Sequence, residues 1–163
     1  MVTEALTAAE HLGVATDLIS VTALQIAPCT GCAACHDHGE CVIRDDMDLI
    51  YSKMLASNGL VIGTPVYFWS ASAQAKAIID RTYALRYPDR RLKGKVGGAI
   101  AVAGRRGCMQ ALSQINSFFL GQEMRVAGLG VAGYGNAIGA IEADTRAISD
   151  ARELGHRIAG LLQ

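Results

Sequence analysis

Residues 59–81 read GLVIGTPVYFWSASAQAKAIIDR, and this stretch decides the fold. The run at 59–65 is apolar, rich in β-branched residues and ends in a Gly-Thr-Pro turn. It therefore predicts a strand that is buried on both faces. The following residues, 70–85, place Ala75 and Ile78 on one face at helical spacing, which predicts an amphipathic helix. A buried strand, a loop and a helix in succession are the repeating unit of a parallel sheet.

The same alternation continues in both directions along the chain. The residue pattern predicts further helices over 2–13, 45–59, 108–123 and 141–163, and further strands over 14–21, over 96–102 and within 124–139. This order predicts a single α/β domain over 1–163, with a doubly wound parallel sheet and helices on both of its faces. Ligands of such sheets bind beyond the carboxyl ends of the strands. We therefore expect the chemistry in the loops that follow the strands, the cysteine-rich loop included.

Composition excludes several classes of function. Of the 163 residues 51% are hydrophobic and 18% are charged, and the formal net charge is zero. This balance gives no basic surface for nucleic acid. No apolar run approaches the ~20 residues that a membrane span needs, and no signal peptide is visible. Five cysteines without an export signal predict thiols or metal ligands in a reducing compartment, which indicates a cytoplasmic protein.

Four of the five cysteines lie in the stretch CTGCAACHDHGEC at 29–41. The C-x2-C-x2-C-x5-C spacing lets Cys29, Cys32, Cys35 and Cys41 surround one compact ion or cluster. Iron–sulfur clusters take four thiolates, and one ferredoxin arrangement begins with the same C-x2-C-x2-C run. Zinc prefers two separate C-x2-C pairs, whereas here the pairs share Cys32. An iron–sulfur cluster, a zinc ion and free thiols in a loop all stay open, and a disulfide knot is disfavoured.

The stretch TPVYFWSAS at 64–72 follows the first quoted strand and carries three consecutive aromatic residues, Tyr67, Phe68 and Trp69. Rings at this edge of a sheet can cover a flat, partly apolar ligand, while the amides of the turn bind its polar rim. Alternatively, the rings pack against the sheet edge or an oligomer interface.

A second loop, AGRRGC at 103–108, has glycines that allow the backbone to approach a ligand closely. Arg105 and Arg106 offer cations for a phosphate or for a developing anion on a ring. The alternative is a solvated turn. Cys108 begins the next helix, and we expect an ordinary helix residue there. A third, glycine-rich loop at 133–144 matches no nucleotide-binding motif.

The stretches PCTGCAACHDHGECVIRDDM, GLVIGTPVYFWSASAQAKAIIDR and AVAGRRG, in this order and spacing, resemble the NADPH-dependent FMN reductase-like family of the flavodoxin-like superfamily. Within that family they are most similar to the iron–sulfur flavoproteins, and the match runs over 17–163. The resemblance implies a flavodoxin-like fold with two loops around the FMN ring. Those loops correspond here to Thr64, Pro65, Val66, Tyr67, Phe68 and Trp69, and to Gly104, Arg105, Arg106 and Gly107.

The resemblance also implies a [4Fe–4S] cluster on Cys29, Cys32, Cys35 and Cys41, close to the flavin of a neighbouring subunit in a homodimer or homotetramer. Family members pass electrons between ferredoxin or NAD(P)H and an acceptor. FMN takes one or two electrons and a cluster conducts one at a time, so that no protein acid or base is required. We accordingly expect no catalytic side chain, and no Ser/His/Asp triad is visible.

The family opens with a strand and a phosphate-binding loop, whereas Met1 falls inside what should be the first helix. We therefore expect the sheet to lack its first strand. If the sequence is complete, we also expect FMN binding to be weakened or absent and chains to associate through open sheet edges. Two alternatives remain open: a cluster-free NAD(P)H:FMN or quinone reductase, and a flavin-less, zinc-stabilised interaction module.

Overall fold

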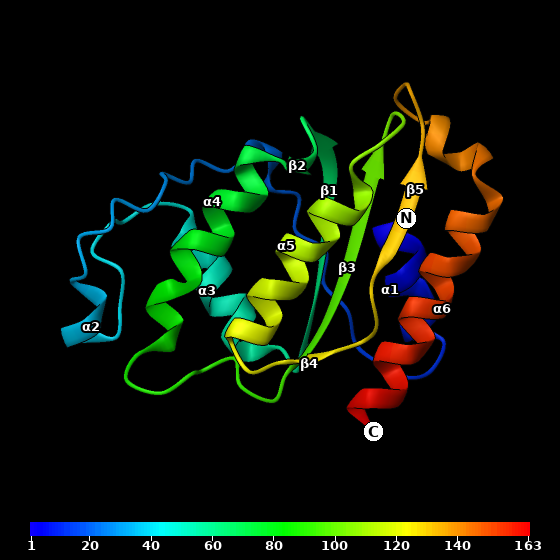
Figure 1. The fold of residues 1–163 in the computed structure, drawn as a ribbon. Coiled ribbons are helices and arrows are strands. Elements are labelled where there is room, and N and C mark those ends of the chain that lie inside the picture. The colour runs from blue at the N-terminus through cyan, green and yellow to red at the C-terminus, as the bar shows by residue number, and fades with distance from the viewer.

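A computed structural model describes residues 1–163, and its centre is a parallel sheet with helices on both faces (Figure 1). The strands are β1 (Gly59–Tyr67), β2 (Ser70–Ala71), β3 (Val96–Ala103), β4 (Arg125–Val126) and β5 (Val131–Tyr134). The helices are α1 (Val2–Glu10), α2 (Cys35–His38), α3 (Met47–Ala56), α4 (Ala73–Arg81), α5 (Cys108–Gly121) and α6 (Thr145–Leu162), with 3-10 turns η1 (Val21–Ala23), η2 (Thr82–Arg86) and η3 (Ala140–Ala143). The predicted doubly wound α/β architecture is confirmed.

Parallel pairing aligns the carboxyl ends of the strands at one edge of the sheet. β1 pairs with β3 along seven positions, from Gly59 opposite Val96 to Pro65 opposite Val102. β3 also pairs in parallel with β4 and with β5, and β2 folds back on the end of β1 as an antiparallel hairpin. The carboxyl ends of β1, β3 and β5 therefore meet at the upper edge in Figure 1.

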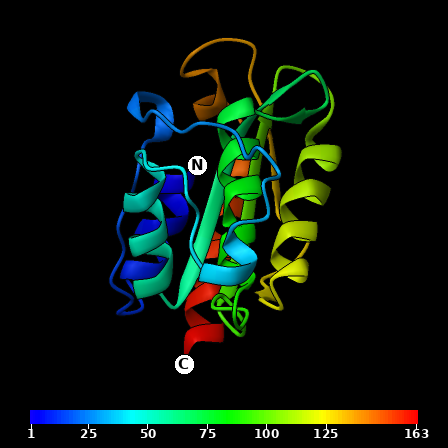
Figure 2. The same cartoon turned by 90° about the vertical axis from the view of Figure 1, so that its left-hand side faces the viewer.

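Two neighbouring glycines of β3 show how helices pack on opposite faces of the sheet. Successive residues of a strand point to opposite faces. A Cβ atom at Gly97 would lie 2.5 Å from the ring of Phe119 of α5, and one at Gly98 would lie 2.8 Å from Ile158 of α6. The helices approach this closely because the glycines carry no side chain. Figure 2 shows α5 and α1 on opposite sides of the strands.

The longest helix, α6, is capped at its amino end by Asp144, whose side chain accepts a hydrogen bond from the amide of Ala147. Its apolar face packs against α1, with Gly155 against the backbone of Ala5. None of the helices combines the length and the apolar character that crossing a bilayer requires.

The prediction that residues 59–65 form the strand buried on both faces is wrong. All but one residue of β3 is buried, whereas most of β1 is only half-buried. The physical reason is position in the sheet. β3 lies between β1 on one side and β4 and β5 on the other, while the second edge of β1 has no strand partner from Gly59 to Pro65.

The strand predicted over 14–21 is also wrong. Residues 14–20 belong to no helix and no ladder, and Leu18 is 57% exposed. A strand exists only where a neighbouring backbone exchanges hydrogen bonds with it. No strand lies between this segment and β1, in agreement with the expectation that the sheet lacks its first strand.

Candidate functional site

The loop that follows β1 is fixed at its base by two polar side chains. The hydroxyl of Thr64 accepts a hydrogen bond from the amide of Ser72 (3.0 Å) and donates to the carbonyl of Pro65 (2.9 Å). Gln114 of α5 accepts hydrogen bonds from the hydroxyl of Ser70 and the amide of Ala71, each at 3.0 Å. The turn is therefore tied to its own strand and to the neighbouring helix.

The tip of this loop holds two aromatic residues in a strained and exposed arrangement. Phe68 and Trp69 have φ angles of 51° and 62°, in the left-handed region that bulky residues rarely adopt. Their rings meet edge to face at 5.4 Å, and Phe68 is 92% exposed. Strained backbone of this kind concentrates at ligand sites, where the surrounding structure holds it in place. The pair presents apolar rings to solvent at the carboxyl edge of the sheet.

The loop that follows β3 meets the aromatic loop directly. Gly107 has a φ of 98°, and a Cβ atom there would lie 2.9 Å from the Cα of Trp69 and 2.9 Å from Val66. Arg105 and Arg106 are exposed on the same loop, and neither forms an ion pair. The structure thus brings together the two loops expected to surround the flavin ring. Their role in binding FMN stays a prediction.

A third loop, after β5, completes this edge and contains a residue that the sequence analysis missed. A Cβ atom at Gly104 would lie 2.9 Å from Oδ1 of Asn136, so the side chain of Asn136 borders the Gly104 loop. The amide of Tyr134 donates to Asp144 (3.1 Å), which anchors the start of the loop. The only sequence signal for Asn136 was its place in a glycine-rich loop after a strand. Gln114, in the middle of a helix, gave none.

Cys108 lies beneath these loops and is buried. Its Sγ lies 3.6 Å from the carbonyl oxygens of Ala101 and Gly133, and burial raises the pKa of the thiol. The negative charge of a nearby Cys108 thiolate would raise the pKa of the Tyr134 hydroxyl, and burial of the hydroxyl raises it further. A buried thiol with a raised pKa is unreactive, which agrees with the expectation that Cys108 is an ordinary helix residue.

The cysteine-rich loop does not reach the carboxyl edge of the sheet. Its short helix α2 lies beside η2, at the lower left of Figure 1, away from the aromatic loop. His36 packs against Tyr87 with ring centroids 4.4 Å apart, and Gly39 lies against the same residue. The expectation that this loop shares the edge with the other loops is wrong, because these contacts hold α2 beside η2, which follows the carboxyl end of α4.

All four cysteines of the loop are free thiols. Cys29 and Cys32 are exposed, and Cys35 and Cys41 are half-buried. Left-handed backbone at Gly31, Ala33 and Gly39 turns the chain between them. No three His, Cys, Asp or Glu side chains converge as metal ligands.

The pKa values of two of these thiols shift in opposite directions. A hydrogen bond from the Ala34 amide, and then one from Thr30, lowers the pKa of Cys32. Burial raises the pKa of Cys35, and the charges of the other three thiols add to this effect. The other three sulfurs therefore lie within electrostatic reach of Cys35. A set of four thiols fits a thiolate-bound metal or cluster chemically, although the loop would have to tighten around it.

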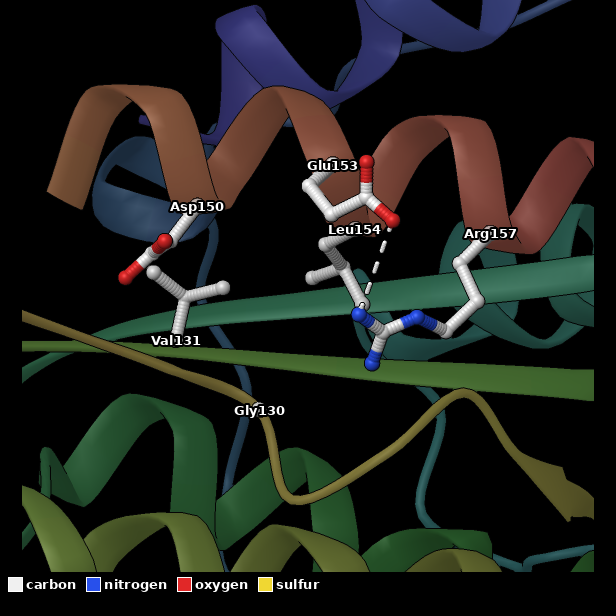
Figure 3. Close-up of a pocket in the computed structure, with 6 residues that line it drawn as sticks. All are labelled: Gly130, Val131, Asp150, Glu153, Leu154 and Arg157. Atoms are coloured by element: carbon white, nitrogen blue, oxygen red, sulfur yellow. Dashed lines mark ion pairs between the residues drawn. The ribbon is translucent and has the colours of Figure 1, made fainter. Parts of the chain in front are cut away.

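A small cavity of about 130 Å³ opens between α6 and the amino end of β5 (Figure 3). An ion pair between Glu153 and Arg157, at 3.7 Å, crosses its lining. None of the residues predicted for a functional site lines it. A second cavity, of about 250 Å³, is lined by Cys41 and Tyr51 among others.

The sequence of the chain is similar to those of a known protein family and of curated relatives. The sequence profile of the family described as NADPH-dependent FMN reductase matches residues 1–139. An iron-sulfur flavoprotein of Methanocaldococcus jannaschii is 38% identical, over all of this chain and 89% of that protein.

Solved structures agree in fold. The crystal structure of RosB superposes with a TM-score of 0.83 at 16% identity, covering 99% of this chain and 70% of that one. A flavodoxin, the WrbA-like protein from Agrobacterium tumefaciens, superposes with a TM-score of 0.56 at 17% identity, covering 69% and 70% of the two chains. The fold is therefore flavodoxin-like, as the sequence predicted.

Proposed function

The chain belongs to the NADPH-dependent FMN reductase family, and on that premise we propose that it transfers electrons between NAD(P)H or ferredoxin and an acceptor through FMN and a [4Fe–4S] cluster. That it is a flavoprotein oxidoreductase follows from the family itself. The electron route, the cluster and the partner proteins are the proposal. Bound FMN would supply the capacity to accept a hydride and to release electrons singly.

The observation that carries the proposal is the contact between the exposed Phe68–Trp69 pair and the Gly107 loop. Two loops from adjacent strands meet there, and one carries the exposed apolar rings while the other carries the exposed Arg105 and Arg106. We assign the residues from Thr64 to Trp69 and from Gly104 to Gly107 to the flavin. The rings exclude water from a flat ligand, and the arginines can stabilise negative charge on it.

The cysteines would hold the cluster. Four free thiols on one short loop suit a group bound by thiolates, and relatives of the chain are named iron-sulfur flavoproteins. α2 lies beside η2, away from the aromatic loop of its own chain. Electrons would therefore pass more readily between the cluster of one subunit and the flavin of a neighbouring subunit. We therefore propose a homodimer or homotetramer in a reducing, cytoplasmic compartment, where such thiols persist.

A second candidate is a cluster-free NAD(P)H:FMN or quinone reductase. The observation that favours it is the absence of any three converging metal ligands in the structure. In this case the four thiols are structural or respond to oxidants. In a variant of this candidate the same thiols bind zinc. A zinc assay of the purified protein distinguishes this variant from the metal-free one.

One sample decides between the candidates. The protein is purified without oxygen, its visible spectrum is recorded, and FMN, iron, sulfide and zinc are assayed together. We expect bound FMN at no more than about one per chain and about four irons per chain, with charge-transfer absorption at about 400 nm that is lost in Cys35→Ser and retained in Cys108→Ser. Flavin without iron would establish the cluster-free reductase. A wild-type protein without flavin that NADPH does not reduce would overturn the proposed function altogether.

A further inference from the structure

Arg81, the last residue of α4, is buried with 1% of its surface exposed, and its guanidinium connects both ends of the cysteine-rich loop. Nη1 donates to the carbonyl of Ala27 (2.9 Å) and to Oδ2 of Asp45 (2.7 Å). Nη2 donates to the carbonyl of Ile43 (2.9 Å) and to Oδ1 of Asp45 (3.1 Å). Ala27 precedes the first cysteine of the loop and Ile43 follows the last, so one planar group binds the incoming and the outgoing chain.

The carboxylate of Asp45 also binds the incoming segment, and it binds the start of α3 as well. It accepts hydrogen bonds from the amide of Ala27 (2.8 Å) and from the amide of Met47 (3.0 Å). Next to it, Asp46 accepts from the amide of Gln25 (2.7 Å). The base of the loop is therefore closed by these side chains together with a backbone hydrogen bond from the amide of Asp46 to the carbonyl of Gln25 (3.3 Å).

We propose that the Arg81–Asp45 pair is a positioning device that sets the separation between Cys29 and Cys41 before a metal or cluster binds. Cys29 follows Ala27 by two positions, and Cys41 precedes Ile43 by two. Two residues span at most ~7 Å of extended chain, so fixing these carbonyls confines both sulfurs to a small volume. This inference rests on the proposed function, because it concerns the residues assigned to the cluster.

The energetics of the pair favour positioning over simple stabilisation. A buried ion pair loses about as much in desolvation as it gains in attraction, so it is weak evidence for stability. Arg81 also leaves its Nε buried without a hydrogen-bond partner, which carries a further cost. What the pair does supply is geometry, since a guanidinium fork bonded to a carboxylate fixes distance and orientation together.

A loop with fixed ends loses less conformational freedom when it closes around a ligand. Tyr51 supports the arrangement, because its hydroxyl donates to the backbone carbonyl of Arg81 (2.7 Å). Tyr51 and Cys41 also line the same cavity, so the support lies directly beside the last cysteine.

The first test uses metal-free protein. Nitroxide labels are attached to Cys29 and Cys41 in a chain whose other three cysteines are replaced by serine, and the distance between the labels is measured by electron paramagnetic resonance. Arg81→Lys keeps the positive charge but cannot form the paired hydrogen bonds of a guanidinium group. We expect this variant to widen the distribution of distances between the two labels at least about twofold. Arg44→Lys is the matched control, because Arg44 lies near Cys41 but its side chain is 64% exposed. Asp45→Asn is the second variant, should Arg81→Lys fail to fold.

The second test uses Co²⁺ as the probe in chains that keep all the cysteines. Loss of an outer-shell partner typically weakens metal affinity about 10- to 100-fold, and we expect this in Arg81→Lys and Asp45→Asn but not in Arg44→Lys. A single cooperative melting transition and an unchanged FMN content would show that the fold is intact. An unchanged label distribution or an unchanged Co²⁺ affinity in folded Arg81→Lys would overturn the inference. Wild-type protein that takes up no iron would instead count against the cluster of the proposed function, since the label distances are measured without metal.

Discussion

Gly107 is the point at which the two proposed flavin loops touch, and replacing it with alanine tests the site most directly. Its φ of 98° is strained for any residue with a side chain, and the cost of holding such a conformation is about 1–3 kcal/mol. The new Cβ would lie 2.9 Å from the Cα of Trp69, which is backbone and cannot turn aside. Overpacking of this kind costs a further ~1–3 kcal/mol. We expect Gly107→Ala to lose about 2–6 kcal/mol of unfolding free energy, the sum of the two effects.

The assay is urea unfolding followed by circular dichroism, paired with an FMN titration followed by flavin fluorescence. Gly121→Ala is the matched control, because Gly121 ends α5 with nothing within 4 Å of the added Cβ. It should gain up to about 1 kcal/mol from its better helix propensity. If the loops respond by moving apart, Gly107→Ala will also bind FMN more weakly, whereas Gly121→Ala will not. A loss in Gly107→Ala no larger than about 0.5 kcal/mol, the scatter of ordinary surface substitutions, would refute the reasoning.

Three further predictions concern the same loops and the base of the cysteine loop. Phe68→Gly removes left-handed backbone strain from an exposed residue, so the unfolding free energy of the variant should rise by up to about 1 kcal/mol. Its FMN affinity should fall about 2- to 12-fold, which is the contribution of one aromatic contact. An FMN affinity equal to that of the wild type would show that Phe68 does not belong to the site. The double variant Arg105→Ala and Arg106→Ala should leave stability within about 0.5 kcal/mol. It should nevertheless slow flavin reduction by NADPH in stopped-flow assays, with Arg146→Ala on α6 as the control. Hydrogen bonds from the buried guanidinium hold the pKa of Asp45 below its ordinary 3.8, so its contribution to stability is full above that value and is lost as the pH falls through the lower, folded-state pKa. Urea midpoints between pH 5 and pH 2 should therefore fall less in Asp45→Asn than in wild type, and parallel curves would contradict the assignment.

The local pattern of residues determined the elements and their class. The apolar run at 59–65 and the helical spacing after it predicted β1 and α4, and the same reading placed β3, α5 and α6 to within a few residues. Such elements are predictable because periodicity and turn residues act over short stretches of chain. The aromatic loop and the Gly104–Gly107 loop were also predictable, since the carboxyl ends of parallel strands always share one edge.

The identity of the central strand depended on the tertiary structure. Both 59–65 and 96–102 are apolar, but 59–65 has a strand partner on one edge only, whereas β3 has partners on both sides and all but one of its residues are buried. Residues 14–20 have strand-like composition and yet form no ladder, because a strand depends on its neighbour more than on its own residues.

The place of the cysteines was likewise decided by contacts that are distant in sequence. Their spacing predicted a common ligand, but the position of α2 follows from the packing of His36 on Tyr87. The closed base of the loop follows from Arg81 and Asp45, which lie 36 positions apart. Sequence alone identified the residues that we assign to the flavin and to the cluster. Only folding decided where they lie and what holds them, because hydrogen bonds between distant residues form only once the chain has packed.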